Sequence, residues 1–257
     1  MRQKTSEIVD GGPPAHILNP EGLSPVVLIC EHASRHIPAC LGSLGLSEAE
    51  RMSHIAWDIG AEGVSRKLSV LLDAPLVLQR YSRLVYDCNR PPQSPGAMPV
   101  MSETTAIAGN QDLSDADRVE RVEQIYKPFH SSVSELLDRR QANGIDPVFA
   151  TVHSFTPVFK GQPREVELGI LHDEDSRLAD IVIAIAGRST DYETRRNEPY
   201  GPEDGVTHTL NLHGGERGLL HVMIEIRNDL VANEQGEAVW AERLRRLLSE
   251  AIAVKDR

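Results

Sequence analysis

An unbroken apolar run, Val26–Cys30, leads directly into Glu31 and His32 and constrains this chain more than any other stretch. A short run of this kind predicts a strand that is buried on both faces, as in the sheet of an α/β protein. Open α/β sheets bind ligands at the carboxyl ends of their strands. We therefore expect His32 to lie at the rim of the core, at an edge of the sheet where other functional residues gather.

The rest of the chain alternates apolar runs with amphipathic stretches. Further strands are predicted at 75–78, 84–86, 148–152, 166–171, 207–212 and 221–226. Helices are predicted at about 58–73, 115–142, 174–187 and 237–253, with a short helix opened by Ser47 and a kink or break at Pro128. Residues 1–24 are rich in Gly, Pro and polar residues and predict an irregular arm. This alternation indicates one α/β domain over 1–257 with a parallel or mixed sheet.

Charge, hydropathy and cysteine content argue against several classes of protein. The net charge of −11 argues against a nucleic-acid or anionic-membrane surface, although it leaves room for a local basic pocket that binds a small anion. No apolar run approaches the ~18–20 residues of a membrane span, and the N-terminus lacks the apolar core of a secretory signal. Three cysteines without C-x-x-C spacing predict free thiols, so we expect a cytoplasmic protein.

Polar and ionisable residues follow the predicted strands at equivalent points. They are Glu31, His32, Asp87, Asn89, Arg90, His153, His172, Asp173, Glu225 and Arg227. A single histidine at such a point is more often structural, but charged groups near a core must be paired, and a metal would hold several together. His32 and His153 with one carboxylate would form a zinc site that leaves a fourth position for water. The motifs of zincins, α/β-hydrolases and nucleotide-binding proteins are absent from the sequence.

Six segments in one order carry a family resemblance: VVLICEHASRHIP, HIAWDIGA, SRLVYDCNRP, VHSFTP, NEPYG and IEIRNDL. Together they resemble the N-formylglutamate amidohydrolase family, which is similar to zinc carboxypeptidases and aspartoacylase. The resemblance covers about residues 20–250. It implies a three-layer α/β/α sandwich with a mixed sheet, of the phosphorylase/hydrolase-like type. It also implies a zinc-dependent amidohydrolase for a small anionic N-acyl amino acid, with N-formyl-L-glutamate giving L-glutamate and formate.

The resemblance implies that His32 and His153 hold one zinc ion per chain. The relatives place a Glu three residues after the first histidine, but Arg35 occupies that position here. We expect Asp58 to be the third ligand, because it lies where the relatives' ligand-bearing helix begins. Glu31 is the alternative. Its place next to His32 on a strand would point it to the opposite face, which makes shared coordination awkward.

Two further residues are implied to take part in catalysis. Glu225 would be the general base that takes a proton from water and returns it to the leaving amine. Its alternative role is that of a strand-end partner for Arg227 or Arg83. Arg83 would stabilise the oxyanion, as the carbonyl-polarising arginine does in aspartoacylase, or would simply pair with Asp87.

The substrate's carboxylates call for basic and amide side chains. Asn89 and Arg90 match the pair that grips an α-carboxylate in the relatives, and arginine forms bidentate pairs with carboxylates. The loop at 195–200 would close over the side-chain carboxylate or remain a solvated loop; its candidates are Arg195, Asn197 and Tyr200, with a further hydrogen bond from His208.

Three other functions stay open on the sequence alone. The chain could deacylate another N-acyl amino acid or act as a carboxypeptidase-like peptidase. It could also be a non-catalytic protein that holds a small anion through Arg90 and Arg195. The sequence gives no indication of the oligomeric state.

Overall fold

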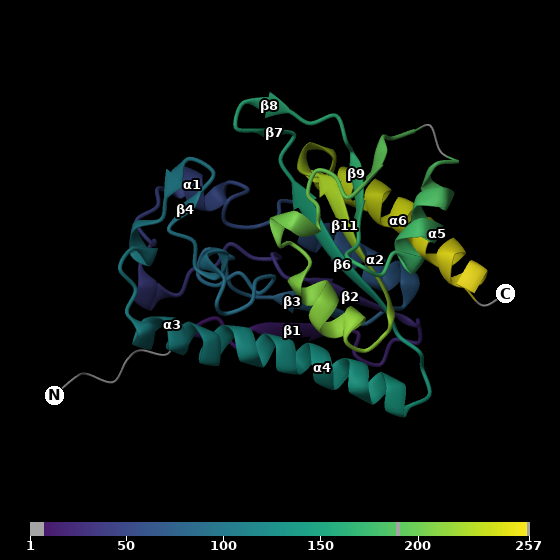
Figure 1. The fold of residues 1–257 in the computed structure, drawn as a ribbon, viewed down its shortest axis with the longest axis horizontal. Coiled ribbons are helices and arrows are strands. Elements are labelled where there is room, and N and C mark those ends of the chain that lie inside the picture. The colour runs from purple at the N-terminus through teal and green to yellow at the C-terminus, as the bar shows by residue number, and fades with distance from the viewer. Residues whose placement is uncertain (1–7, 189–190, 256–257) are drawn as a thin grey trace.

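A mixed seven-stranded sheet forms the centre of the computed structural model, which describes residues 8–188 and 191–255 (Figure 1). The strands are ordered β1 (Ala15–Leu18), β3 (Leu76–Gln79), β2 (Val26–Cys30), β6 (Val148–Phe155), β11 (Leu220–Arg227), β9 (Leu168–Leu171) and β10 (Thr194–Arg196). Strands β3, β2, β6 and β11 are mutually parallel, whereas β1 is antiparallel to β3 and β9 is antiparallel to β11. The carboxyl ends of the four central strands therefore meet at one edge.

Helices cover both faces of this sheet. Helices α2 (Ala61–Leu72), α5 (Arg177–Ala186) and α6 (Glu234–Lys255) share one face of the sheet, toward which Leu28 of β2 points. Helix α2 contacts β2, α5 contacts β9 and β11, and α6 packs against both helices. Helix α4 (Lys127–Ala142) packs on the other face, where Ile29 of β2 points. Figure 1 shows α4 and α3 (Asp115–Arg121) lying end to end below the sheet. The predicted α/β fold is confirmed, and its layers follow from the alternation of side chains along strands that are buried on both faces.

Smaller elements surround the carboxyl edge of the sheet. Helix α1 (Glu48–Met52) begins at the predicted cap Ser47, whose side chain and that of Glu50 form a capping box. Two short hairpins, β4 (Met101–Ser102) with β5 (Thr105–Ala106) and β7 (Val158–Phe159) with β8 (Gln162–Pro163), lie near this edge. Single helical turns occur at Ala39–Leu41, Pro95–Ala97, Ala108–Asn110, Pro202–Asp204 and Asn228–Val231.

Three predicted elements are wrong in detail. Part of the predicted arm is strand β1, which adds to the edge of the sheet. The apolar piece at 84–86 is a buried turn, whose backbone bonds to Ser82 instead of a neighbouring strand. The predicted strand at 207–212 is helical and continues as a π-helical segment, Leu210–Gly215. Both apolar pieces, at 84–86 and 207–212, pack against the core but do not pair with the sheet. Their apolar residues reflect burial, which the prediction took as the sign of a strand.

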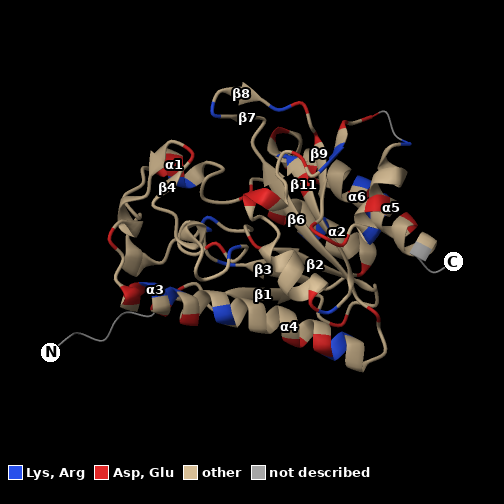
Figure 2. Ribbon diagram, in the orientation of Figure 1, with Lys and Arg blue, Asp and Glu red and all other residues tan. Residues whose placement is uncertain are grey.

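The long helix at 115–142 does not break at Pro128. A π-helical segment, Val122–Tyr126, joins α3 to α4, and Pro128 lies in the first turn of α4. Proline lacks the backbone N–H that an uninterrupted helix needs at this point, and a wide turn just before it relieves the mismatch. Acidic and basic residues alternate along α3 and α4 (Figure 2), as on a solvated helix face. No helix in the described part of the chain combines the length and apolar character that crossing a membrane requires.

Candidate active site

Three parallel strands bring polar residues together at the carboxyl edge of the sheet. His32 is the second residue after the end of β2, and His153 lies near the end of β6. On β11, Glu225 is the direct neighbour of His153 in the parallel register. Asp58 reaches the same place from the loop before α2, where its backbone N–H donates to the carbonyl of His32 at 3.0 Å.

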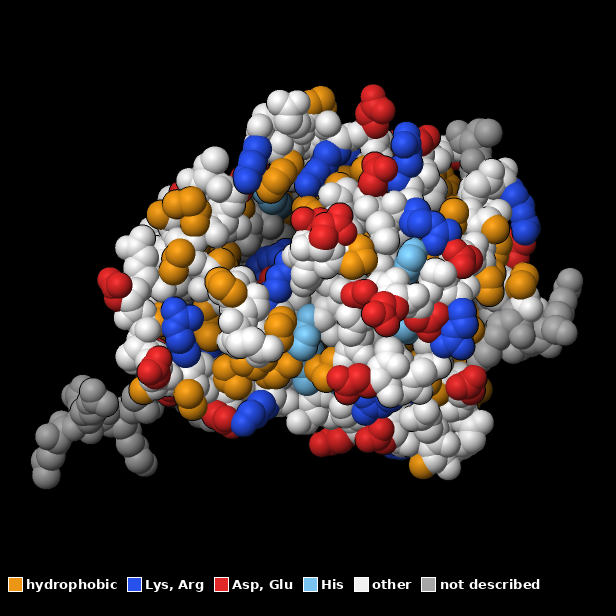
Figure 3. All heavy atoms as spheres, viewed as in Figure 1, with side chains coloured by type: hydrophobic (Ala, Val, Ile, Leu, Met, Phe, Trp, Pro, Cys, Tyr) orange, Lys and Arg blue, Asp and Glu red, His pale blue; other side chains and the backbone are white. Residues whose placement is uncertain are grey.

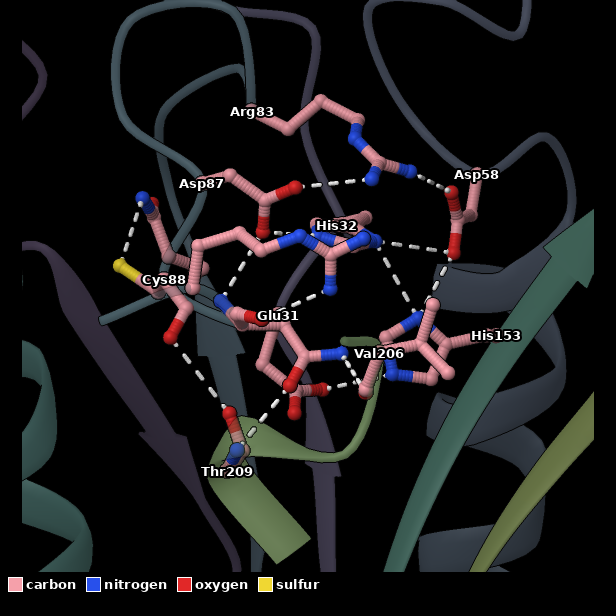
Figure 4. A network of polar contacts seen from close by, with 12 residues as sticks. Glu31, His32, Asp58, Arg83, Asp87, Cys88, His153, Val206 and Thr209 are labelled. Atoms are coloured by element: carbon pink, nitrogen blue, oxygen red, sulfur yellow. Dashed lines mark hydrogen bonds and ion pairs between the residues drawn. The ribbon is translucent and has the colours of Figure 1, made fainter. Parts of the chain in front are cut away.

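His32, Asp58 and His153 form a compact, buried triad (Figure 4). Asp58 Oδ2 lies 3.2 Å from His32 Nδ1 and 2.9 Å from His153 Nδ1, and the two Nδ1 atoms are 3.2 Å apart. Ligands that sit 2.0–2.1 Å from a tetrahedral zinc ion are about 3.3 Å from one another. The three atoms thus have nearly the spacing of one face of a tetrahedral zinc site.

The opposite nitrogen of each histidine faces a second carboxylate. His32 Nε2 lies 2.8 Å from Asp87 Oδ1, and His153 Nε2 lies 3.1 Å from Glu31 Oε2, the latter pair without hydrogen-bond alignment. Carboxylates behind metal-binding histidines fix the ring orientation and turn the other nitrogen toward the metal. Glu31 thus lies behind His153, while Asp58 lies on the side where both Nδ1 atoms converge.

The pKa values of the triad reflect this crowding of carboxylates. Burial lowers the pKa of His153, but the charge of Glu31 and the hydrogen bond with Asp58 outweigh it, so the net pKa is raised well above its usual value. Burial raises the pKa of Asp58, but the charge of His32 and the hydrogen bond with His153 lower it below its usual range. The carboxylates therefore stabilise positive charge at the triad, which either protons or a bound cation can supply.

Glu225 and Arg83 stand on two sides of the triad. Glu225 is buried, and its Oε2 atom has no hydrogen-bond partner among the described residues. Burial raises the pKa of Glu225 to about 7, despite the nearby charge of His153. Arg83, whose side chain is 28% exposed, donates to Asp58 Oδ1 at 3.3 Å and to Asp87 Oδ2 at 2.8 Å. The pairing with Asp87 that the sequence offered as an alternative is therefore present, and Arg83 also holds Asp58.

A cavity of about 610 Å³ opens above these residues. Figure 3 shows the hollow, with basic side chains inside it and hydrophobic side chains around its mouth. Of the predicted site residues, it is lined by His32, Asp58, Arg83, Asn89, Arg90, His153, Tyr200 and Glu225. Sequence reasoning missed several other lining residues, among them Phe155, Phe159, Lys160 and Arg164. These come from β6 and the β7–β8 hairpin, whose strands are too short to leave a sequence pattern.

Asn89 is engaged with the backbone of a neighbouring segment. Its Nδ2 donates to the carbonyl of Val206 at 2.5 Å, and its Oδ1 accepts from the N–H of Thr209 at 3.0 Å. The guanidinium of Arg90 donates to the carbonyls of Asn89 and Gly205. The turn at 87–90 thus fixes the segment that covers one side of the cavity.

Arg195, Asn197 and His208 lie outside the lining of the cavity, contrary to expectation. Arg195 is exposed on β10 and pairs with Glu193. Asn197 Oδ1 accepts from the N–H of His172, and His208 Nε2 lies 2.8 Å from the hydroxyl of Tyr126. Of the predicted loop, only its last two residues, Pro199 and Tyr200, line the cavity, because β10 runs along the outer edge of the sheet.

Comparison with known proteins agrees with this geometry. A model of the N-formylglutamate amidohydrolase family matches residues 24–232. This chain belongs to that family. A gene product of Agrobacterium tumefaciens, Atu2144, has a solved structure with 52% sequence identity and a TM-score of 0.96; the match covers 98% of this chain and 100% of that one. No curated protein matches the chain.

A second solved structure supports the fold of this N-formylglutamate amidohydrolase family member. It is the N-formylglutamate amidohydrolase from Ralstonia eutropha JMP134, with 20% identity and a TM-score of 0.66, covering 95% of this chain and 99% of that one. The predicted family and fold class are therefore confirmed. The family indicates a hydrolase that acts on amide bonds.

Proposed function

We propose that this chain is a zinc-dependent amidohydrolase that cleaves the linear amide of an N-acyl acidic amino acid. N-formyl-L-glutamate, hydrolysed to L-glutamate and formate, is the expected substrate. The observation that carries the proposal is the convergence of His32, Asp58 and His153 beside Glu225, a buried carboxyl with a free oxygen. Membership of the family supports the same reaction class.

The donor set fits zinc. Two imidazole nitrogens and one carboxylate oxygen, nearly at tetrahedral spacing, are the ligands of many catalytic zinc sites. Zinc bound by His32, His153 and Asp58 would polarise the amide carbonyl and lower the pKa of water. Asp87 and Glu31 would hold the two imidazoles in the orientation that this requires.

Glu225 would move the proton during hydrolysis. As general base it takes a proton from the water that attacks the formyl carbon, and as general acid it passes this proton to the nitrogen of the departing amino acid. Its pKa, raised by burial to about 7, lies near the pH at which a cytoplasmic enzyme works. A carboxyl that gains and loses a proton with similar ease suits both steps.

Arginines would position the rest of the substrate. Arg83 is held against Asp58 and Asp87 with part of its guanidinium open to the cavity, where it can stabilise negative charge that develops on the carbonyl oxygen. Arg90 would bind the α-carboxylate, since its guanidinium forms no ion pair with a carboxylate of the described residues. Asn89 would support Arg90 by holding the adjoining segment.

Steady-state kinetics of the zinc-loaded chain test this function. We expect formate release from N-formyl-L-glutamate with a kcat/KM well above that for N-acetyl-L-glutamate or peptidyl glutamate. A preference for the acetyl or peptidyl compound would replace the formyl assignment by one of the two alternative amidase functions. Tight anion binding with no hydrolysis of any of the three would identify a non-catalytic binding protein.

Location in the cytoplasm is part of the proposal. Cys30, Cys40 and Cys88 are all unpaired, and Cys40 is exposed. Free thiols are typical of a reducing compartment. Zinc and a small N-acyl amino acid are the partners that the proposal requires.

A further inference from the structure

The arginines that line the cavity differ in how their charge is compensated. Arg83 is paired with two carboxylates, whereas Arg90 and Arg164 contact no carboxylate among the described residues. Both are only partly exposed. A guanidinium that is removed from bulk water gains most from a ligand carboxylate, with which it forms bidentate hydrogen bonds. The cavity therefore offers two separate places for ligand anions.

Arg164 is held in place by aromatic rings. Its guanidinium carbon lies 4.6 Å from the ring centre of Phe159, 4.8 Å from that of Tyr200 and 5.6 Å from that of Phe155. Nη1 also donates to the hydroxyl of Tyr200 at 3.1 Å and to the carbonyl of Thr156 at 3.3 Å. Stacking and these two hydrogen bonds fix the plane of the guanidinium before any ligand arrives.

The remaining edge of this guanidinium is unused. Nε and Nη2 of Arg164 donate to no atom of the described residues. Their N–H groups are parallel, so together they can donate to the two oxygens of one carboxylate. The acidic residues at this end of the cavity are already engaged: Glu103 pairs with His54 at 3.1 Å, and Asp204 accepts a backbone hydrogen bond. Lys160 is exposed at the tip of the hairpin, where its ammonium lies over the ring of Phe159.

We propose that Arg164 binds the side-chain carboxylate of the substrate and that it sets the preference for an acidic amino acid. The inference rests on the proposed function, in which Arg90 takes the α-carboxylate. Two guanidiniums that form no ion pair among the described residues, one on the turn at 87–90 and the other at the foot of the β7–β8 hairpin, match the two carboxylates of an N-acyl glutamate or aspartate. This role replaces the one expected of Arg195, which lies outside the cavity lining.

Kinetics on N-formyl-L-glutamate and N-formyl-L-glutamine test the proposal, because glutamine lacks only the side-chain carboxylate. Arg164→Gln should lower kcat/KM for the glutamate compound on the order of 10- to 100-fold and leave that for the glutamine compound nearly unchanged. Arg164→Lys, which keeps the charge without the fork, should retain part of the preference. Arg246→Gln, an exposed arginine on α6, is the matched control. Equal losses on both compounds, or no loss on either, would overturn the proposal.

A binding measurement separates failure of this inference from failure of the proposed function. Calorimetry with glutarate, which has two carboxylates, and valerate, which has one, needs no hydrolysis. We expect wild-type protein to bind glutarate on the order of 10- to 100-fold more tightly than valerate, and Arg164→Gln to abolish this difference. If neither N-formyl compound is hydrolysed but this result holds, only the proposed reaction fails. If wild-type protein does not distinguish the two acids, the role of Arg164 is refuted.

Discussion

His32 and His153, which come from the ends of two neighbouring strands, have the same arrangement of carboxylates around their ring nitrogens. Each turns Nδ1 toward Asp58 and Nε2 toward another carboxylate, Asp87 or Glu31. When the single N–H of each neutral imidazole is on Nε2, facing Asp87 or Glu31, the two Nδ1 atoms and the Asp58 oxygen are three acceptors at close range in a buried site, which is unfavourable. A cation ligated by all three resolves this conflict.

Removing the carboxylate of Asp58 and removing that of Glu31 should affect zinc binding differently. Asp58→Ala takes away one of the three converging atoms, so zinc should be lost. Glu31→Ala removes a group behind His153, so zinc should be retained with an affinity reduced by roughly 10- to 100-fold. Competition with a chromophoric chelator measures both affinities. Loss of zinc from Glu31→Ala with retention by Asp58→Ala would reverse the assignment of the third ligand.

Glu225→Gln tests the proton-transfer role. The amide keeps the size of the side chain but cannot accept the proton of water, so turnover should fall by ~10²–10⁴ while zinc content is unchanged. Formate release and metal analysis on the same preparation provide both readouts. A fully active variant would remove Glu225 from the mechanism.

The raised pKa of Glu225 also predicts a pH dependence of stability in the metal-free protein. Burial favours the protonated carboxyl in the folded state and raises its pKa from 4.5 to about 7. The stability that this group contributes is therefore full below about pH 4.5 and is lost as the pH rises through about 7.

Glutamine does not titrate, so Glu225→Gln should gain stability relative to wild type over that interval. Urea unfolding of both proteins in the presence of a chelator, at several pH values, measures the difference in free energy of unfolding. A difference that does not change between pH 4.5 and 8 would contradict the raised pKa. Comparing the two proteins cancels the contributions of the other carboxyls.

At the scale of elements, the short connection into α2 fixes the position of Asp58. Gly60 is the residue before the helix and has a φ of 80°, a conformation that glycine adopts without the steric strain that a Cβ brings. A Cβ at Gly60 would lie 2.2 Å from the carbonyl oxygen of Val231. The N–H of Ser154 and the carbonyl of His32 hold Asp58 from the other side.

Gly60→Ala should therefore disturb both stability and metal binding. The positive φ and the steric conflict should cost roughly 1–3 kcal/mol of unfolding free energy, with weaker zinc binding as Asp58 shifts. Gly144→Ala is a useful control, since Gly144 also has a positive φ but no atom within 4 Å of an added Cβ. A similar loss of zinc affinity in both variants would contradict a specific role of the α2 connection.

The elements that the sequence predicted well are those with long apolar runs. Strands β2, β6 and β11 were all expected, and their parallel ends carry His32, His153 and Glu225. The β7–β8 hairpin has two residues in each strand, too few for any periodicity. Arg164 was therefore missed, because the hairpin that turns it back onto Phe155 and Phe159 leaves no pattern, and Tyr200 is 36 residues away in the sequence.

The segment after residue 206 shows the opposite failure. Its apolar residues indicated a strand, but Asn89 binds the backbone at Val206 and Thr209 and the chain turns into a helix there. Asp87 and Glu31 were recognised as strand-end residues, yet their contacts with the outer nitrogens of the histidines depend on side-chain geometry. A sequence pattern does not report which atom of an imidazole faces which carboxylate.

At the scale of the whole molecule, the polarity of the sheet makes the site. Parallel strands deliver their carboxyl ends to one edge, and the two hairpins and the segment at 199–206 wall the cavity above it. The net charge of −11 coexists with a cavity that contains three arginines and one lysine. A small anionic substrate can therefore bind to an acidic protein, while a large polyanion finds no extended basic surface among the described residues.

The central claim is that hydrolysis depends on a metal ion at His32, Asp58 and His153. The most direct measurement is formate release from N-formyl-L-glutamate by protein whose metal content is determined before and after chelation. We predict about one zinc per chain, loss of activity when it is removed, and recovery on addition of one equivalent. Full activity in folded, metal-free protein would contradict the account.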